Sequence, residues 1–328
     1  MIIKDNLKYG YFLTGFGLNG ILYIFTNIIP LHIMQGLMLT MIYIIAGLGV
    51  GLLLFLTGLI NFSTSIFIGI GSYITAHILK KFIIPYSILI ILIIGCAIIL
   101  GIVIGFLSLR VSGTQLLIIT MSLSIMISII SALPNPISGG PNGLYNIPYA
   151  KLFCFIPLNR NLLYFIILLV LYILIIIDNN IIYGPIGRSL RAIKTNEKMA
   201  ASMGINIVKY KILIFVIATI HSMLAGMLYI NFMQSTVYTT WSINLSMNIL
   251  LAVCLGGTVK PIGVILGTFF IFGLDYIVLQ NIPIFQNNSQ FSLLFSAILI
   301  IIILLKFPGG LYHIYYNIKS HLRKEGKK

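Results

Sequence analysis

Long apolar runs alternate with short polar segments along nearly the whole chain. A helix that crosses the bilayer core needs about 20 apolar residues. Ten runs come near that length: 11–29, 32–56, 59–79, 83–108, 114–133, 161–177, 212–232, 246–258, 261–280 and 291–306. The runs 59–79 and 246–258 are short or interrupted by glycine, as in re-entrant or broken helices, which membranes tolerate only where protein or a water-filled cavity covers the backbone. The pattern predicts an all-α polytopic membrane protein, one domain over residues 1–328, with about ten transmembrane or re-entrant helices.

One long polar stretch, residues 184–211, separates two of these runs. It reads GPIGRSLRAIKTNEKMAASMGINIVKYK and contains seven charged side chains. Each would cost about 2.5–3.5 kcal/mol at a bilayer centre, so the stretch must lie outside the hydrocarbon. Asn196 can cap a helix that starts at Glu197, and Gly204 suits the position just past a helix end. We therefore predict a short surface helix from Asn196 to Met203; the alternative is a solvated loop that only fixes orientation.

The distribution of lysine and arginine predicts the orientation. If the N-terminus is inside and the runs alternate, 16 of the 20 basic residues fall inside, including six in the stretch 184–211 and six from Lys306 onward. Basic residues concentrate on the cytoplasmic side of membrane proteins. The bias predicts a chain with both termini inside, a cytoplasmic stretch 184–211 and a basic cytoplasmic tail over 307–328. Four basic residues fall outside, and two of them are adjacent: Lys80, Lys81, Lys151 and Arg160.

The composition argues against several classes of function. The chain is 59% hydrophobic and 8% charged, and its net charge of +15 lies between apolar runs, which indicates membrane anchoring rather than a nucleic-acid partner. Three scattered cysteines (Cys96, Cys154 and Cys254) have no metal-binding spacing. No ATP-binding loop, H-E-x-x-H or G-x-S-x-G occurs. We expect no metal, no cofactor and no enzymatic activity.

Carboxylates are almost absent from the apolar runs. Among the five acids, Asp178 falls at a run's end and Asp275 near the outer end of another, while the others lie in polar segments. Ion-coupled carriers usually need acids inside the membrane, so we do not expect one here. We interpret His77 and His221 as packing residues. A pore with neither ion coupling nor ATP hydrolysis is either passive or powered by a partner.

Small residues recur at four-residue spacing, as in helices that approach one another closely. We expect these pairs to pack within one bundle, although a subunit interface is the alternative: Gly47/Gly51, Gly101/Gly105, Ser222/Gly226 and Gly263/Gly267.

Several stretches together resemble the branched-chain amino-acid ABC permeases of the LivM type. The resemblance rests on motifs that occur in the family's order: Thr57-Gly58, Phe67 to Tyr73, Ser138 to Leu144, Arg191-Ala192-Ile193 through Asn196-Glu197, Ala200, Met203 to Asn206, Tyr210-Lys211, Phe215-Val216, Ala225-Gly226, Leu228-Tyr229, Leu255-Gly256-Gly257, Gly263, Leu266-Gly267 and Phe307 to Leu311. Each motif is weak alone, whereas the ordered set spans most of the chain.

This resemblance implies a multi-subunit importer in the bacterial cell (inner) membrane. The expected partners are a second permease subunit, two cytoplasmic ATP-binding cassette subunits and an extracytoplasmic solute-binding protein. The helix Asn196–Met203 would couple the permease to the ATPase, with Glu197, Ala200 and Gly204 on the family's positions. Small residues such as Ala200 and Ala201 would allow close approach. Arg188 and Arg191 could pair with acids of the ATPase or only anchor the stretch.

The chain departs from the family pattern in its membrane part. Asn248 stands where the family often has Glu, Thr258 stands where a third glycine is common, and Ser63 and Thr64 replace a Gly and a His or Gln. An amino acid needs polar partners for its charged ends, and the candidates are Asn61, Ser63, Thr64, Ser122, Ser124 and Asn248. Each could instead form an ordinary hydrogen bond between helices.

The expected solute is a branched-chain or other apolar amino acid. The same departures leave urea, a short amide or another small polar solute as alternatives. A passive channel without ATPase partners is a further alternative, although a channel has no need of the stretch 184–211.

Overall fold

A computed structural model describes residues 30–82, 84–108, 113–134, 136–152, 156–157, 159–257 and 260–278, and isolated positions from 298 to 313. Its longer elements are α2 (Leu31–Thr57), α3 (Thr64–Lys81), α4 (Tyr86–Ser108), α5 (Gly113–Ala132), α6 (Arg160–Tyr183), α9 (Ile207–Met233), α10 (Ile243–Gly256) and α11 (Pro261–Thr268), the last continuing as a π-helix over Phe269–Val278.

Five described helices are long and apolar enough to cross a membrane: α2, α4, α5, α6 and α9. They coincide with five predicted runs, which confirms the helical reading of those segments. The run 11–29 lies outside the described residues, and so does most of the run 291–306. The total of ten helices and the inside position of both termini therefore remain predictions.

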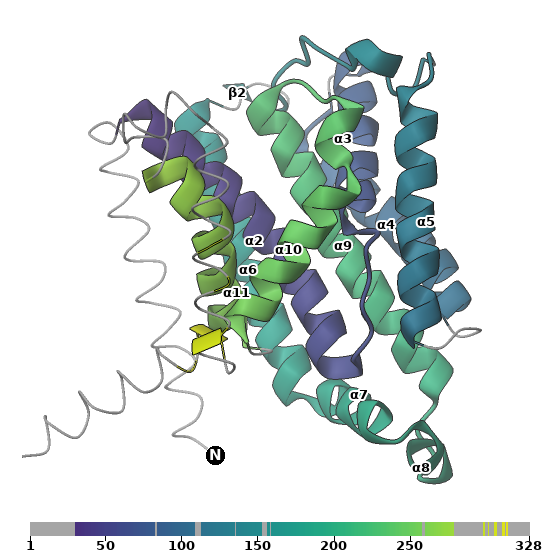
Figure 1. Cartoon of the computed structure of the whole chain (residues 1–328). Coiled ribbons are helices and arrows are strands. Elements are labelled where there is room, and N and C mark those ends of the chain that lie inside the picture. The colour runs from purple at the N-terminus through teal and green to yellow at the C-terminus, as the bar shows by residue number, and fades with distance from the viewer. Residues whose placement is uncertain are drawn as a thin grey trace, which may run out of the picture.

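The short elements gather at the two ends of the bundle (Figure 1). At one end lie a single turn of helix at Gly140–Asn142 and the paired two-residue strands β1 (Lys151–Leu152) and β2 (Ile156–Pro157). At the other end lie α7 (Pro185–Thr195) and α8 (Glu197–Ser202), in the predicted polar stretch.

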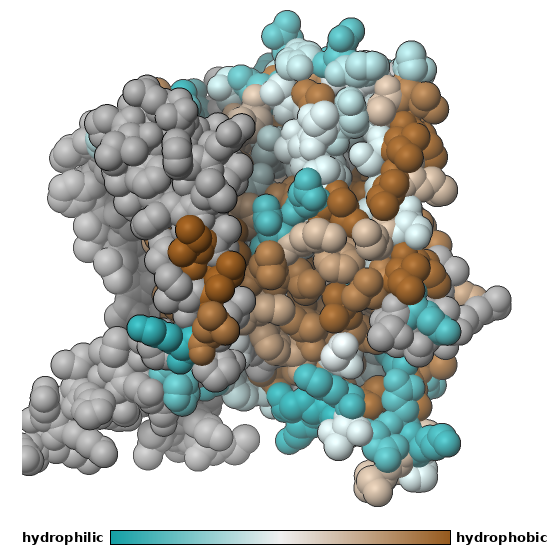
Figure 2. All heavy atoms as spheres, viewed as in Figure 1, coloured by the Kyte–Doolittle hydropathy of each residue, from teal (hydrophilic) through white to brown (hydrophobic). Residues whose placement is uncertain are grey.

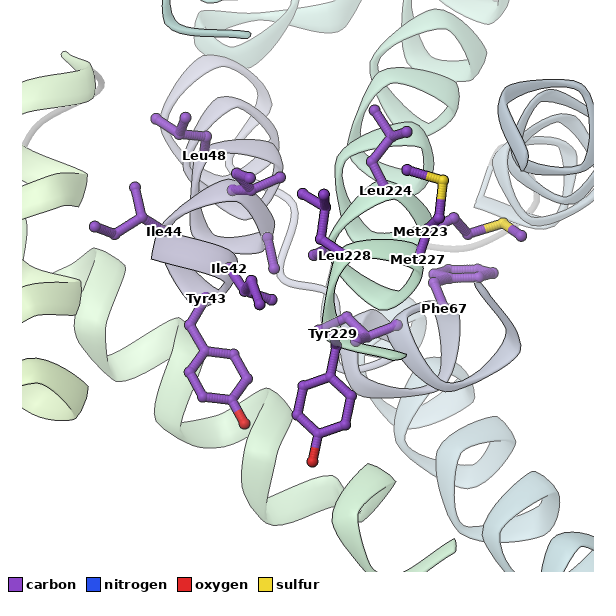
Figure 3. Packing of buried hydrophobic residues seen from close by; sticks show 14 of the residues in the cluster. Ile42, Tyr43, Ile44, Leu48, Phe67, Met223, Leu224, Met227, Leu228 and Tyr229 are labelled. Atoms are coloured by element: carbon purple, nitrogen blue, oxygen red, sulfur yellow. The ribbon is translucent and has the colours of Figure 1, made fainter. Parts of the chain in front are cut away.

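Helix α9 lies at the centre of the fold and packs against α2, α3 and α4. Buried aliphatic and methionine side chains cover several faces of α9: Leu228 points toward α2, whereas Met223 lies on the opposite side, near Phe67 of α3 (Figure 3). Because these side chains are buried on several faces of α9, the helix lacks the polar face of a water-exposed helix.

Small residues bring the helices into close contact. A Cβ on Gly226 of α9 would clash with the Ile68 carbonyl of α3, and one on Gly101 of α4 would lie 2.6 Å from Val216 Cα of α9. The other predicted pairs also meet neighbouring helices of this chain: Gly47 and Gly51 face α10 and α11, and Gly263 and Gly267 face α10. These contacts confirm that the pairs pack within one bundle.

The outer surface separates into an apolar band and two hydrophilic ends (Figure 2). Helices α4 and α5 expose large apolar side chains, such as Ile91 (69% exposed) and Ile118 (62% exposed). Such a surface suits the hydrocarbon core of a bilayer, where apolar side chains need no burial against protein.

Candidate coupling site and membrane path

Helix α7 is an amphipathic helix that lies across one end of the bundle (Figure 1), and it was not predicted from the sequence. It buries Leu190 and Ile193, which are three residues apart and share one face. Arg188 and Arg191 are exposed. The alternation of these two residue types within 185–195 was the signal that could have revealed the helix.

Helix α8 confirms the predicted short surface helix. The Asn196 side chain accepts a hydrogen bond from the Met199 backbone N–H at 3.1 Å, and the helix begins at Glu197. Gly204 follows the helix with φ +81°, a conformation that favours glycine, and its N–H donates to the Ala201 carbonyl.

An ion pair joins α8 to the start of α9. Lys211 Nζ lies 2.7 Å from Glu197 Oε1, and the Lys211 side chain is only 9% exposed. Glu197 therefore has two roles in the structure: it lies in the first turn of α8, where a negative charge is favoured, and it neutralises a buried lysine.

Ala200 lies on the inner face of α8. It is 2% exposed, so we correct the expectation that its small size leaves room for a partner. On the outer face, Met199 is 58% exposed and Met203 is 71% exposed, next to the exposed Lys198 and Ala201. These two methionines were missed because only their position in the folded helix distinguishes them from membrane-facing methionines.

A non-helical segment, residues 58–63, separates α2 from α3 and contains the start of the run 59–79, for which a re-entrant or broken helix was expected. Its backbone is held by side chains of α5: the Phe62 N–H donates to Thr120 Oγ1 at 3.2 Å, and Ser124 Oγ donates to the Phe62 carbonyl at 2.7 Å. Thr120 and Ser124 lie near the middle of the 20-residue helix α5. The Phe62 end of the segment therefore lies level with the middle of α5, and we call the whole segment the α2–α3 break.

Three predicted path residues meet at this break. Asn61 Oδ1 accepts hydrogen bonds from the backbone and the hydroxyl of Ser63, and Thr64 begins α3. Next to them Ser65 is bonded to Ser246 of α10 through both its backbone N–H and its hydroxyl, at 2.8 Å each.

The structure places Ser122 and Asn248 away from this cluster. Both are exposed, whereas Ser124 and Ser246 are buried and face the break. Two residues that are two positions apart on a helix are rotated by about 200° around its axis. Only one member of each pair, Ser122/Ser124 or Ser246/Asn248, can therefore face the break. Ser122 and Asn248 thus lie on the outer side of their helices.

Asp178 and His221 form a buried pair that changes the sequence interpretation. Asp178 was expected at a span end, but it lies within α6 and is 1% exposed. Its Oδ1 lies 3.2 Å from His221 Nε2 of α9, and His221 Nδ1 lies 2.8 Å from the Ile217 carbonyl. His221 is a buried packing residue, as expected, but it has an acidic partner. In the described part of the chain, no group of three acidic, histidine or cysteine side chains could hold a metal ion.

A protein-family model described as branched-chain amino acid transport system / permease component matches residues 32–304. The chain belongs to this family. Over 296 residues it is 25% identical to the high-affinity branched-chain amino acid transport system permease protein LivM of Escherichia coli (strain K12), and the alignment covers 83% of this chain and 68% of that protein. The LivM protein of Salmonella typhimurium (strain LT2) matches with the same identity and coverage. No solved structure matches.

Family membership shows the class of protein to which these features belong. The permease is a multi-pass membrane protein and one component of a transport system that has several subunits. Its relatives are transport components rather than enzymes. The matched range contains both the α7–α8 element and the α2–α3 break, so both belong to the part of the permease that the family shares.

Proposed function

We propose that this permease is a membrane-spanning subunit of an ABC importer for branched-chain or other apolar amino acids in a bacterial inner membrane. The observation that supports it most is α8, a capped helix that projects beyond the bundle (Figure 1) and has two exposed methionines, Met199 and Met203. The sequence contains no ATP-binding loop, and in this proposal the energy comes from partner ATPase subunits.

The coupling face consists of Met199 and Met203 with the exposed bases Arg188, Arg191 and Lys198 around them. Methionine is adaptable and polarisable, which suits a contact that must rearrange during a transport cycle. Exposed large apolar side chains outside the apolar band favour a protein partner over water. In this proposal each ATPase contributes an apolar cleft with acidic groups at its rim.

The α2–α3 break provides half of the proposed path. Non-helical backbone at membrane depth is tolerated where it is covered by protein or lines a water-filled cavity, and transporters use such interruptions for substrate sites. Asn61, Ser63, Thr64 and Ser124 offer polar partners for the charged ends of an amino acid, while the apolar bundle suits its side chain. A second, related permease subunit would supply the other half.

The coupling face can be tested by purifying the permease with its candidate ATPases. The double variant Met199→Asp/Met203→Asp should lose the ATPases and amino-acid uptake but remain folded. Met233→Asp, which changes an exposed methionine at the other end of α9, should retain both. Failure of the unaltered permease to associate with any ATPase would support a passive channel instead.

The solute can be tested separately in proteoliposomes that contain the complete importer and its binding protein. We expect ATP-dependent uptake of radiolabelled leucine, isoleucine or valine. Uptake of urea or a short amide with no uptake of these amino acids would refute the amino-acid assignment and leave the coupling assignment intact.

A further inference from the structure

The end of α2 is held partly by a residue of α7, which together with α8 we call the coupling element. Within the last turn, Thr57 Oγ1 donates to the Leu53 carbonyl at 2.5 Å, and the Gly58 N–H donates to the Leu54 carbonyl at 2.9 Å. The next carbonyl, that of Phe55, accepts a hydrogen bond from Lys194 Nζ of α7 at 3.1 Å. The first two donors belong to the same turn, whereas Lys194 comes from a segment 139 residues further along the chain.

The aliphatic part of Lys194 also fits the backbone at this point. Gly58 has φ +75°, and a Cβ added there would lie 3.5 to 3.9 Å from the Lys194 side chain. The lysine therefore lies across the first residue of the α2–α3 break while its ammonium group reaches the helix end. A positive charge is favoured there because the unpaired carbonyls of a helix C-terminus bear partial negative charge.

The position of this contact connects two parts of the permease. Lys194 lies in the last turn of α7, two residues before the cap of α8. Gly58 lies three residues before Asn61, in the segment that α5 holds through Phe62. A displacement of α7 and α8 therefore reaches the start of the break through the Lys194 side chain, and Asn61 lies three residues further along the backbone.

We propose that Lys194 is a positioning residue that transmits movement of the coupling element to the α2–α3 break. When a partner shifts α8 and α7, the ammonium group moves the end of α2 with them, and the residues that follow Gly58 change their arrangement. The inference rests on the proposed importer function, because it requires a partner that moves α8.

The test compares three variants in the complete importer, reconstituted with its ATPases and binding protein. Lys194→Met keeps an unbranched side chain over Gly58 but removes the donor. Lys194→Arg keeps a donor. Lys209→Met removes an exposed lysine near the start of α9 and serves as the matched control.

We expect Lys194→Met to assemble and hydrolyse ATP within about twofold of the unaltered importer while uptake per ATP falls about tenfold, as for loss of coupling between two sites. Lys194→Arg should recover most of the uptake, and Lys209→Met should change neither rate. A purely structural lysine would lower assembly, hydrolysis and uptake together. That result, or normal uptake by Lys194→Met, would overturn the proposal. Failure of the unaltered chain to bind ATPases would instead refute the importer function.

Discussion

The contact between α3 and α9 predicts opposite effects for the same substitution at two glycines. Gly226 of α9 faces the backbone of α3, where an added Cβ would lie 2.9 Å from both the Ile68 carbonyl carbon and the Ser72 nitrogen and would clash with the Ile68 oxygen. Gly95 lies on the exposed side of α4, and an added Cβ there meets no atom within 4 Å. Neither glycine has a positive φ, so only the neighbouring atoms distinguish them.

The size of the effect follows from this geometry. Ordinary contact begins at 3.4 Å, so the helices must separate by at least 0.5 Å at Gly226, and the obstacle is backbone rather than a flexible side chain. Overpacking of this kind costs about 1–3 kcal/mol. Replacing glycine with alanine in a helix gains about 1 kcal/mol at both sites. Because the obstacle at Gly226 is backbone, the overpacking cost there should be at the upper end, about 3 kcal/mol. After the gain of about 1 kcal/mol, Gly226→Ala should lower stability by about 2 kcal/mol, and Gly95→Ala should raise it by about 1 kcal/mol.

Thermal unfolding of the purified permease in one detergent can measure both variants. At about 2 °C per kcal/mol for a chain of this size, Gly226→Ala should unfold about 4 °C lower and Gly95→Ala about 2 °C higher than the unaltered chain. Equal unfolding temperatures for the two variants would show that α3 and α9 do not approach each other at Gly226.

Three further substitutions test the site. Asn196→Ala removes the cap of a six-residue helix at a cost of about 1 kcal/mol, so α8 should become more susceptible to trypsin while global unfolding is unchanged. Ser124→Ala, which removes a hydrogen bond to the break, should lower uptake several-fold, whereas the outward-facing Ser122→Ala should not; equal effects would contradict the placement. Asp178→Leu should destabilise the fold by about 3 kcal/mol in thermal unfolding, and adding His221→Leu should restore most of it, because a lone buried polar partner costs more than an apolar pair.

The sequence was sufficient where the structure depends on neighbours along the chain. The ends of α8 follow from Asn196 and Gly204, whose effects act over three or four residues. The five long helices of the membrane part follow from apolar runs of the right length.

Contacts between distant segments could not be predicted in this way. Asp178 and His221 are 43 positions apart, and nothing local to Asp178 distinguishes a span end from the buried interior of a longer helix. The same limit applies to Ser122 and Ser124, because both are serines in one apolar run and only the packing of α5 determines which one faces the break. Helix periodicity relates the two positions but does not say which is inside.

Two buried basic side chains on α9 show how the fold restricts the stretch 184–211. Lys211 is paired with Glu197 near the start of the helix, and His221 is paired with Asp178 ten positions further on. Both partners precede α9 in the chain, so the two pairs hold α9 to α6 and to α8, on either side of α7. An unpaired charge in these places would be costly, so each pair resists separation of the elements that it joins. In the importer that we propose, a force on α8 would therefore act on α6 to α9 together, and Lys194 donates a hydrogen bond from this unit to the end of α2.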